Sequence, residues 1–247
     1  MLISLGENAD HRNVLFAQQD CFTPSSIRRD TVLRTDRPFA AALYLGERSI
    51  STHTERKRTL ISSFSLGVLG PCALCAEEQV GLHRALNNIA PLGWQYQVAG
   101  DVILNYGAQF DQRLLKNDFA EIAAGIGAEA DTYRTNANVH ARLELGRFNS
   151  AFDAPTGSFR AFQASAFLAG QANVVGYDAT CQGGVFDRDS PHVLSAPSLL
   201  RMVLRGEVGV HLRYHSFALL YSKTFTTREF RTGLDHGWGS IDIMIFF

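Results

Sequence analysis

The sequence lacks a long hydrophobic run, a strong excess of one charge and many prolines. No stretch reaches the roughly 18 consecutive apolar residues that a membrane-spanning helix requires. The 23 Lys and Arg residues balance 24 Asp and Glu residues, which excludes a nucleic-acid-binding protein driven by bulk positive charge. Proline is sparse at 7, so strand breakers are few. No linker, internal repeat or low-complexity segment divides the chain, and residues 1–247 are expected to form one domain.

Three segments alternate strictly between apolar and polar residues. The first covers residues 94–106, and the others cover residues 138–145 and 207–215. Alternation with a period of two predicts β-strands. In the first segment the apolar positions have aromatic residues at both ends and aliphatic residues between them, which is typical of the lipid-facing band of an outer-membrane barrel.

The alternating strands also fit a second class of proteins, because water-soluble barrels and sandwiches use amphipathic strands as well. The number of repeats favours the membrane barrel. Residues 240–247 form a further alternating strand that ends in Phe247, as is usual for bacterial outer-membrane barrels. The sequence therefore predicts an all-β fold, an antiparallel transmembrane β-barrel with short rim helices.

The four cysteines leave several possibilities open. Cys72 and Cys75 form a CxxC pair, which is compatible with a redox pair, half a zinc site or a loop disulfide in an oxidising compartment. A zinc site needs two more ligands at suitable spacing. Cys21 and Cys181 are distant in the sequence and are expected to be unpaired. We favour the loop disulfide.

The first residues lack the basic region and the apolar core of a secretory signal peptide. Ile3 and Leu5 are interpreted as the tail of a strand, residues 8–11 as a turn, and Val14 as the start of the next strand. We therefore expect the natural start of the protein to lie upstream of Met1.

The segment that follows Gly70 and Pro71 predicts a short helix over residues 77–84. Gln79 and His83 are four residues apart, so they lie on one face of this helix. An imidazole titrates near neutral pH and can take a proton from water as the water attacks an ester carbonyl. The Gln79 amide or a bound cation could stabilise the resulting oxyanion. The alternative is a surface histidine that only forms a hydrogen bond within its loop.

Ordered short motifs occur from the first residues to the last. They lie at residues 18–24 (QQDCFTP), 36–40 (DRPFA), 43–45 (LYL), 67–71 (GVLGP), 77–83 (EEQVGLH), 93–97 (GWQYQ) and 228–233 (REFRTG). Their order and approximate spacing resemble the lipid A 3'-O-deacylase family of outer-membrane barrels. One such motif would carry little weight, but the ordered set is specific.

This resemblance implies a barrel of twelve strands with the active site between the barrel wall and the rim loops. The implied reaction is hydrolysis of the ester that links the 3'-acyloxyacyl chain to the glucosamine disaccharide of lipid A, with Ca²⁺ assisting. The resemblance assigns catalysis to His83, as general base on water, and to Gln79. It also implies a monomer in the outer membrane of a Gram-negative bacterium, with lipid A or lipopolysaccharide and outer-membrane lipids as partners and no nucleic acid.

Arg28 and Arg29 form a basic pair in the loop after residues 18–24. In the family, a basic pair near this place is thought to meet the phosphate or sugar-acid groups of lipopolysaccharide. The forked guanidinium group suits phosphate because it binds two oxygens at once. The resemblance therefore assigns substrate binding to Arg28 and Arg29, and a solvated surface pair is the alternative.

The sequence departs from the family pattern at its beginning. Family members carry an Asn-Asp pair on the first strand, with the Asp helping to hold calcium. Aligning residues 3–6 with the middle of the second strand leaves the first strand and part of the second before Met1. Asn8 and Asp10 lie in the predicted turn and do not take over this role, so the metal ligands stay unknown.

This departure supports an alternative function, a catalytically impaired or passive outer-membrane barrel with a structural or pore role. An outer-membrane phospholipase A is disfavoured, because its His-x-Ser-Asn-Gly stretch is absent.

Two further groups of residues are predicted to have structural roles. Asp36 and Arg37 are predicted to pair across a turn that enters the next strand. His211, Arg213 and His215 are predicted to lie on one polar strand face, where they belong to the charge network that fills a barrel lumen.

Overall fold

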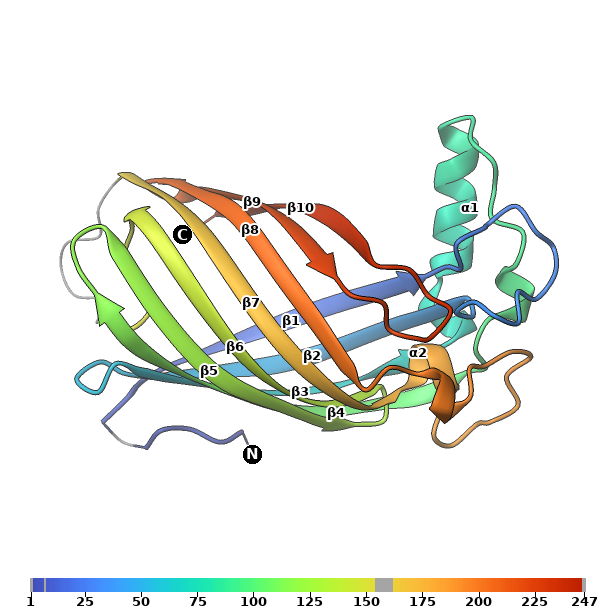
Figure 1. Ribbon diagram of the computed structural model, residues 1–247, viewed down its shortest axis with the longest axis horizontal. Helices are drawn as coiled ribbons and strands as arrows, with labels where there is room; N and C mark the ends of the chain where they lie inside the picture. The colour runs from blue at the N-terminus through green and yellow to red at the C-terminus, as the bar shows by residue number, and fades with distance from the viewer. Residues whose placement is uncertain (1, 7, 154–161, 246–247) are drawn as a thin grey trace.

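The fold is a meander of ten antiparallel strands, each paired with the next along the chain (Figure 1). The computed structural model describes residues 2–6, 8–153 and 162–245. The strands are β1 (Asp10–Phe22), β2 (Ala40–His53), β3 (Arg58–Leu69), β4 (Asp101–Lys116), β5 (Ala120–Asp131), β6 (Arg134–Arg147), β7 (Phe162–Asp178), β8 (Met202–Tyr214), β9 (Phe217–Thr226) and β10 (His236–Ile245). Each is at least as long as the about 9–11 residues that cross a bilayer in a tilted strand.

The sheet curls on itself, and most of its long connections lie at one end (Figure 1). The end that carries α1 (Cys75–Ala85) and α2 (Ala179–Gln182) has the long loops, and we call it the rim. The opposite end includes the short turns before β3, β5 and β9. β1 and β10 are the edges of the sheet, and within the described residues neither pairs with a second strand. The resemblance implies twelve strands, and the described residues form ten.

The strand register separates an apolar wall from a polar interior, as the alternation predicted. On β3 and β4, Leu66 pairs with Leu104 and Phe64 with Tyr106, so these apolar side chains share the outer face. On β6, Val139 lies on the outer face, whereas His140 lines an interior cavity of about 650 Å³. An exposed apolar belt on every strand around a polar interior is typical of a transmembrane barrel. The fold class predicted from the sequence is therefore confirmed.

No helix within the described parts of the chain is long and apolar enough to span a membrane.

The prediction of a strand over residues 94–106 was wrong in its first half. β4 begins at Asp101, and Trp94–Tyr96 form the 3-10 helix η2. Trp94 is buried against Phe39, with the ring centroids 4.9 Å apart, and therefore does not face lipid. Gly93 permits this packing, because a Cβ atom there would lie 2.3 Å from the Phe39 ring.

The interpretation of Ile3 and Leu5 as the tail of a strand was also wrong. The described residues before β1 lie against the outer face of β2 and β3, where the Leu5 amide donates to Ser51 Oγ at 2.9 Å. Ser62 Oγ donates to the Ile3 carbonyl at 2.8 Å. β1 contains the predicted start of a strand at Val14 but begins earlier, at Asp10.

The largest buried clusters lie at the rim and not between the strand centres. One contains Leu69, Val98, Ile103 and Tyr133. Another contains Phe39, Cys75 and Trp94, together with two buried alanines. Because a polar lumen cannot form an apolar core, these clusters hold the loops in place, and the backbone ladders hold the strands.

At the end opposite the rim, the segment Phe148–Asp153 turns into the lumen. Four of its residues line the same interior cavity as His140: Phe148, Asn149, Ala151 and Phe152. Asp153 accepts hydrogen bonds from Lys57 Nζ at 2.7 Å and from Arg113 Nη1 at 2.8 Å, and it also pairs with Lys116. Burial raises the pKa of Asp153, but these three cations outweigh burial and hold the pKa below its ordinary value. We call this segment the inner plug.

Candidate active site

The predicted helix lies at the rim, in residues 70–100, which connect β3 to β4. We call this segment the α1 excursion. The Gly70 amide donates to the Ala41 carbonyl at 2.7 Å, and the Val98 amide donates to the Phe39 carbonyl at 2.9 Å. Both ends of the excursion are thus hydrogen-bonded to the start of β2. Gly70 has a φ of 86°, and a Cβ atom there would lie 2.7 Å from the Ala99 carbonyl oxygen. The glycine is needed because the two ends approach each other this closely.

The base of α1 is fixed to β1 by a disulfide between Cys21 and Cys75, whose Cα atoms are 5.8 Å apart. Gln19 Nε2 also donates to the Ala73 carbonyl at 2.7 Å, immediately before α1 begins. The expectation that Cys21 is unpaired was therefore wrong. Cys72 is an exposed free thiol, so the CxxC pair is not the disulfide that we favoured, and one of its members pairs outside the motif. Cys181 is free and buried, as expected of an unpaired cysteine.

Gln79 and His83 lie one turn apart on α1, and both side chains are half-buried. His83 Nδ1 lies 2.6 Å from the Ile89 carbonyl oxygen. Since a carbonyl oxygen only accepts, Nδ1 carries the proton, and in the neutral ring the lone pair belongs to Nε2. Among the described residues, neither His83 Nε2 nor the Gln79 amide forms a hydrogen bond with a side chain. The helix therefore presents one base and one amide donor, both available to a ligand.

The surface beside these two groups is apolar. Leu82 and Leu86 follow the same face of α1 and are 58% and 67% exposed. Ile89, in the segment after the helix, is also exposed. Exposed leucines next to an available imidazole suit a ligand that is both apolar and hydrolysable.

Arg28 and Arg29 lie in the loop between β1 and β2, and both are exposed. The residue before this pair contacts the α1 excursion: the Ile27 carbonyl accepts a hydrogen bond from the Leu92 amide at 2.9 Å. Asp30 and Gln95 add a second hydrogen bond between the same two segments. Neither arginine forms an ion pair within the described residues. The structure thus places the basic pair on the loop that borders the α1 excursion.

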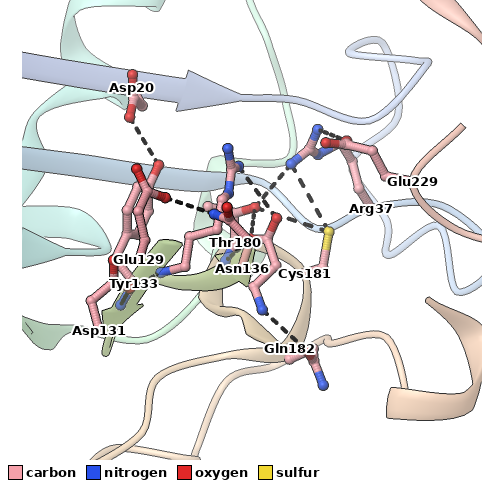
Figure 2. A network of polar contacts seen from close by, with 12 residues as sticks. Asp20, Arg37, Glu129, Asp131, Tyr133, Asn136, Thr180, Cys181, Gln182 and Glu229 are labelled. Carbon is pink, nitrogen blue, oxygen red and sulfur yellow. Dashed lines mark hydrogen bonds and ion pairs between the residues drawn. The ribbon is translucent and has the colours of Figure 1, made fainter. Parts of the chain in front are cut away.

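A polar network at the rim was not predicted from the sequence (Figure 2). Arg37 Nη1 pairs with Glu229 at 3.2 Å, and Arg37 Nη2 donates to Thr180 Oγ1 at 3.0 Å. Arg134 pairs with Asp178 at 3.3 Å. The predicted pairing of Asp36 with Arg37 was wrong, because the carboxylate of Asp36 accepts from Ser25 and from the Arg37 amide instead.

The same network includes a further carboxylate, Asp20, and a buried thiol, Cys181. Asp20 accepts hydrogen bonds from Tyr44 and Tyr133 at 3.1 and 3.0 Å. Burial, followed by the nearby carboxylate of Asp178, raises the pKa of Cys181 to about 12. This thiol therefore stays protonated and unreactive at neutral pH. The network thus joins three rim loops to the strands.

The interior histidines do not form a metal site. His211 and Arg213 lie on β8, but His215 falls in the turn after the strand with a φ of 50° and does not continue their face. Within residues 2–6, 8–153 and 162–245, no group of three or more His, Cys, Asp or Glu side chains is placed to hold a metal ion. Ca²⁺ takes about six to eight oxygen ligands. Several of these can be backbone or amide carbonyl oxygens, so the calcium ion that the resemblance implies stays a prediction.

Comparisons with known proteins agree with the fold. A family model described as "Outer membrane protein LpxR" matches residues 2–247. Among solved structures, LpxR from Salmonella typhimurium is similar in fold, with a TM-score of 0.83 at 20% sequence identity. The alignment covers 100% of this chain and 86% of that chain. No curated protein matches the chain in sequence.

Proposed function

The chain belongs to the LpxR family of outer-membrane proteins, and on that basis we propose that it is an ester hydrolase acting on lipid A. The reaction that we propose removes the acyloxyacyl chain linked at the 3' position. Localisation in the outer membrane follows from the family and agrees with the apolar wall of the barrel. The lipid A or lipopolysaccharide substrate occupies this same membrane, so enzyme and substrate meet there.

One observation carries the proposal: His83 keeps Nε2 available on a helix at the rim, because its Nδ1 donates to the Ile89 carbonyl. In the proposed reaction Nε2 takes a proton from water, and the hydroxide attacks the ester carbonyl. The Gln79 amide donates to the oxyanion of the tetrahedral intermediate. When the acyl–oxygen bond breaks, the imidazolium returns the proton to the sugar oxygen. The products are the free fatty acid and the 3'-hydroxyl group.

The neighbouring side chains suit the two chemical parts of the substrate. Leu82 and Leu86 offer apolar surface to an acyl chain. Arg28 and Arg29 offer paired donors to a lipid A phosphate or sugar-acid group. The assistance of Ca²⁺ stays a prediction from the resemblance, and the steps above use only groups of the protein.

A passive pore has less support than the hydrolase. The inner plug, Phe148–Asp153, lines the lumen at the end opposite the rim and is held there by three cations. A pore would require an open lumen at this end.

The test is mass spectrometry of lipid A from cells that express the protein. We expect the wild type to release the 3'-linked acyl chains, and His83→Ala to reduce this release by about 100-fold or more, the usual effect of removing a general base. His53→Ala, at the opposite end of β2, is the matched control and should keep wild-type activity. An unchanged acyl pattern with the wild type would refute the deacylase, and full activity of His83→Ala would refute the role of His83.

A further inference from the structure

The attachment of α1 to the barrel is concentrated at the first residues of the helix. Cys75 and Ala76 pack in the rim cluster around Phe39 and Trp94. From Glu77 onward, the side chains of α1 are exposed or half-buried. Figure 1 shows α1 standing away from the strands, connected to them at its base. The orientation of the helix therefore depends on this contact at its base and on the hydrogen bond from Leu92 to Ile27 in the segment that follows it.

The start of α1 has no side-chain cap. The residue before α1 is Leu74, which has a φ of 63° and provides no cap hydrogen bond. The first turn thus lacks the side-chain hydrogen bond that Ser, Thr, Asp or Asn would supply. At this point the Cys21–Cys75 disulfide and the hydrogen bond from Gln19 to the Ala73 carbonyl connect the start of α1 to β1.

A small rotation at the base becomes a large displacement at His83. His83 follows Cys75 by eight residues, which corresponds to about 12 Å along the helix axis. A tilt of about 10° at the base would move the imidazole by about 2 Å over this length. Misplacement of a reacting group by about 1 Å can reduce a rate by about 100-fold. The rate of hydrolysis should therefore depend on how firmly Cys75 is held.

We propose that the Cys21–Cys75 disulfide is a positioning element of the active site, which ties α1 to the edge strand β1 and holds His83 and Gln79 in their reactive orientation. This inference rests on the proposed function, since it assigns the disulfide a part in that same reaction. Its action is confined to orientation: the disulfide takes no part in the bond-making and bond-breaking steps, so its loss should lower kcat and leave the binding groups Arg28 and Arg29 in place.

The kinetic test compares two variants of the full chain in outer membranes. Cys21→Ala/Cys75→Ala removes the disulfide, and Cys72→Ala removes the nearby free thiol as a matched control. We expect the double variant to lower kcat by about 10- to 100-fold, with KM within about threefold of the wild type, and the control to match the wild type. Retention of the heat-dependent shift on gels would show that the barrel still assembles. Unchanged kcat in the double variant, or equal losses in the double variant and the control, would overturn the proposal.

A second measurement does not depend on activity. A nitroxide attached through Leu86→Cys reports the motion of α1, in a Cys72→Ala background with or without the Cys21→Ala/Cys75→Ala pair. We expect a restricted spectrum with the disulfide and a mobile spectrum without it. Equal spectra would overturn the positioning role. A wild type without deacylase activity would refute the proposed function alone, because the spectra would still decide whether the disulfide orients the helix.

Discussion

The two ends of the barrel hold their inserted segments by different means. At the rim, the α1 excursion is anchored through its backbone and through the Cys21–Cys75 disulfide. At the opposite end, the inner plug is anchored through the side chain of Asp153, which is surrounded by Lys57, Arg113 and Lys116. One segment projects from the rim, and the other turns into the lumen.

This difference shows which end is arranged for chemistry. The anchors of α1 do not use the Gln79 amide or His83 Nε2, so these polar atoms stay available for a ligand. The inner plug uses the Asp153 carboxylate for its own attachment, and Lys57, Arg113 and Lys116 are all paired with it. We therefore expect substitutions at the rim to change turnover and substitutions at the plug to change local stability.

After the loss of His83 itself, the largest effect is expected from the amide beside the proposed base. Gln79→Ala removes the donor assigned to the oxyanion, and loss of one such donor lowers kcat by about 100-fold. Glu78→Ala is the matched control, because Glu78 is an exposed neighbour on α1. Its rate should stay within about twofold of the wild type. Turnover of purified lipid A, measured by release of fatty acid, distinguishes these outcomes, and equal rates for both variants would remove Gln79 from the mechanism.

A smaller effect at the same end concerns binding. Arg28→Ala/Arg29→Ala removes the exposed basic pair beside the excursion, and one charge-assisted hydrogen bond is worth about 1.5 kcal/mol, or about tenfold in affinity. We expect KM for lipid A to rise by about tenfold while kcat changes little. Arg56→Ala, an exposed arginine at the opposite end, controls for the loss of charge. A KM equal to that of the wild type would identify Arg28 and Arg29 as a solvated surface pair.

Much of the barrel could be predicted from the sequence, because the register of a strand keeps each residue on one face. The alternation over residues 138–145 predicted the faces of β6 correctly, down to Val139 outside and His140 inside. The same pattern failed at Trp94, whose contact with Phe39 depends on a loop more than fifty positions away in the chain. A pattern of alternation does not reveal which tertiary contact covers a side chain.

The candidate site was only partly predictable for a similar reason. Gln79 and His83 share a helix face, and local spacing is enough to bring them together. Cys21 and Cys75 are separated by 54 positions, and Arg37 and Glu229 by 192. A meander places alternate strand ends at the same rim, so these residues could be assigned to one end of the barrel. Which of them pair depends on how the rim loops fold, and the sequence pattern does not specify this.

At the opposite end, Asp153→Asn tests how the inner plug is held. The change keeps the shape of the side chain but removes its charge, which weakens three partly exposed ion pairs. We expect amide hydrogen exchange in residues 148–153 to become about tenfold faster, consistent with about 1–2 kcal/mol of lost local stability. Asp118→Asn, in an exposed turn at the same end, is the control. Deacylation should stay within about twofold of the wild type, because Asp153 and α1 lie at opposite ends of the barrel and substitutions at distant sites act independently.

The smallest effect is the response of the plug to acid. The three cations hold the pKa of Asp153 below its ordinary value in the folded protein. A carboxylate whose pKa is lowered by folding contributes its full stabilisation above the unfolded pKa, about 3.9 for Asp, and loses it as the pH falls toward the folded pKa. The protection factors of residues 148–153 should therefore be constant from about pH 7 to pH 5 and should decrease only below about pH 4. A decrease between pH 7 and pH 5 would show that another group, not Asp153, holds the plug in the lumen.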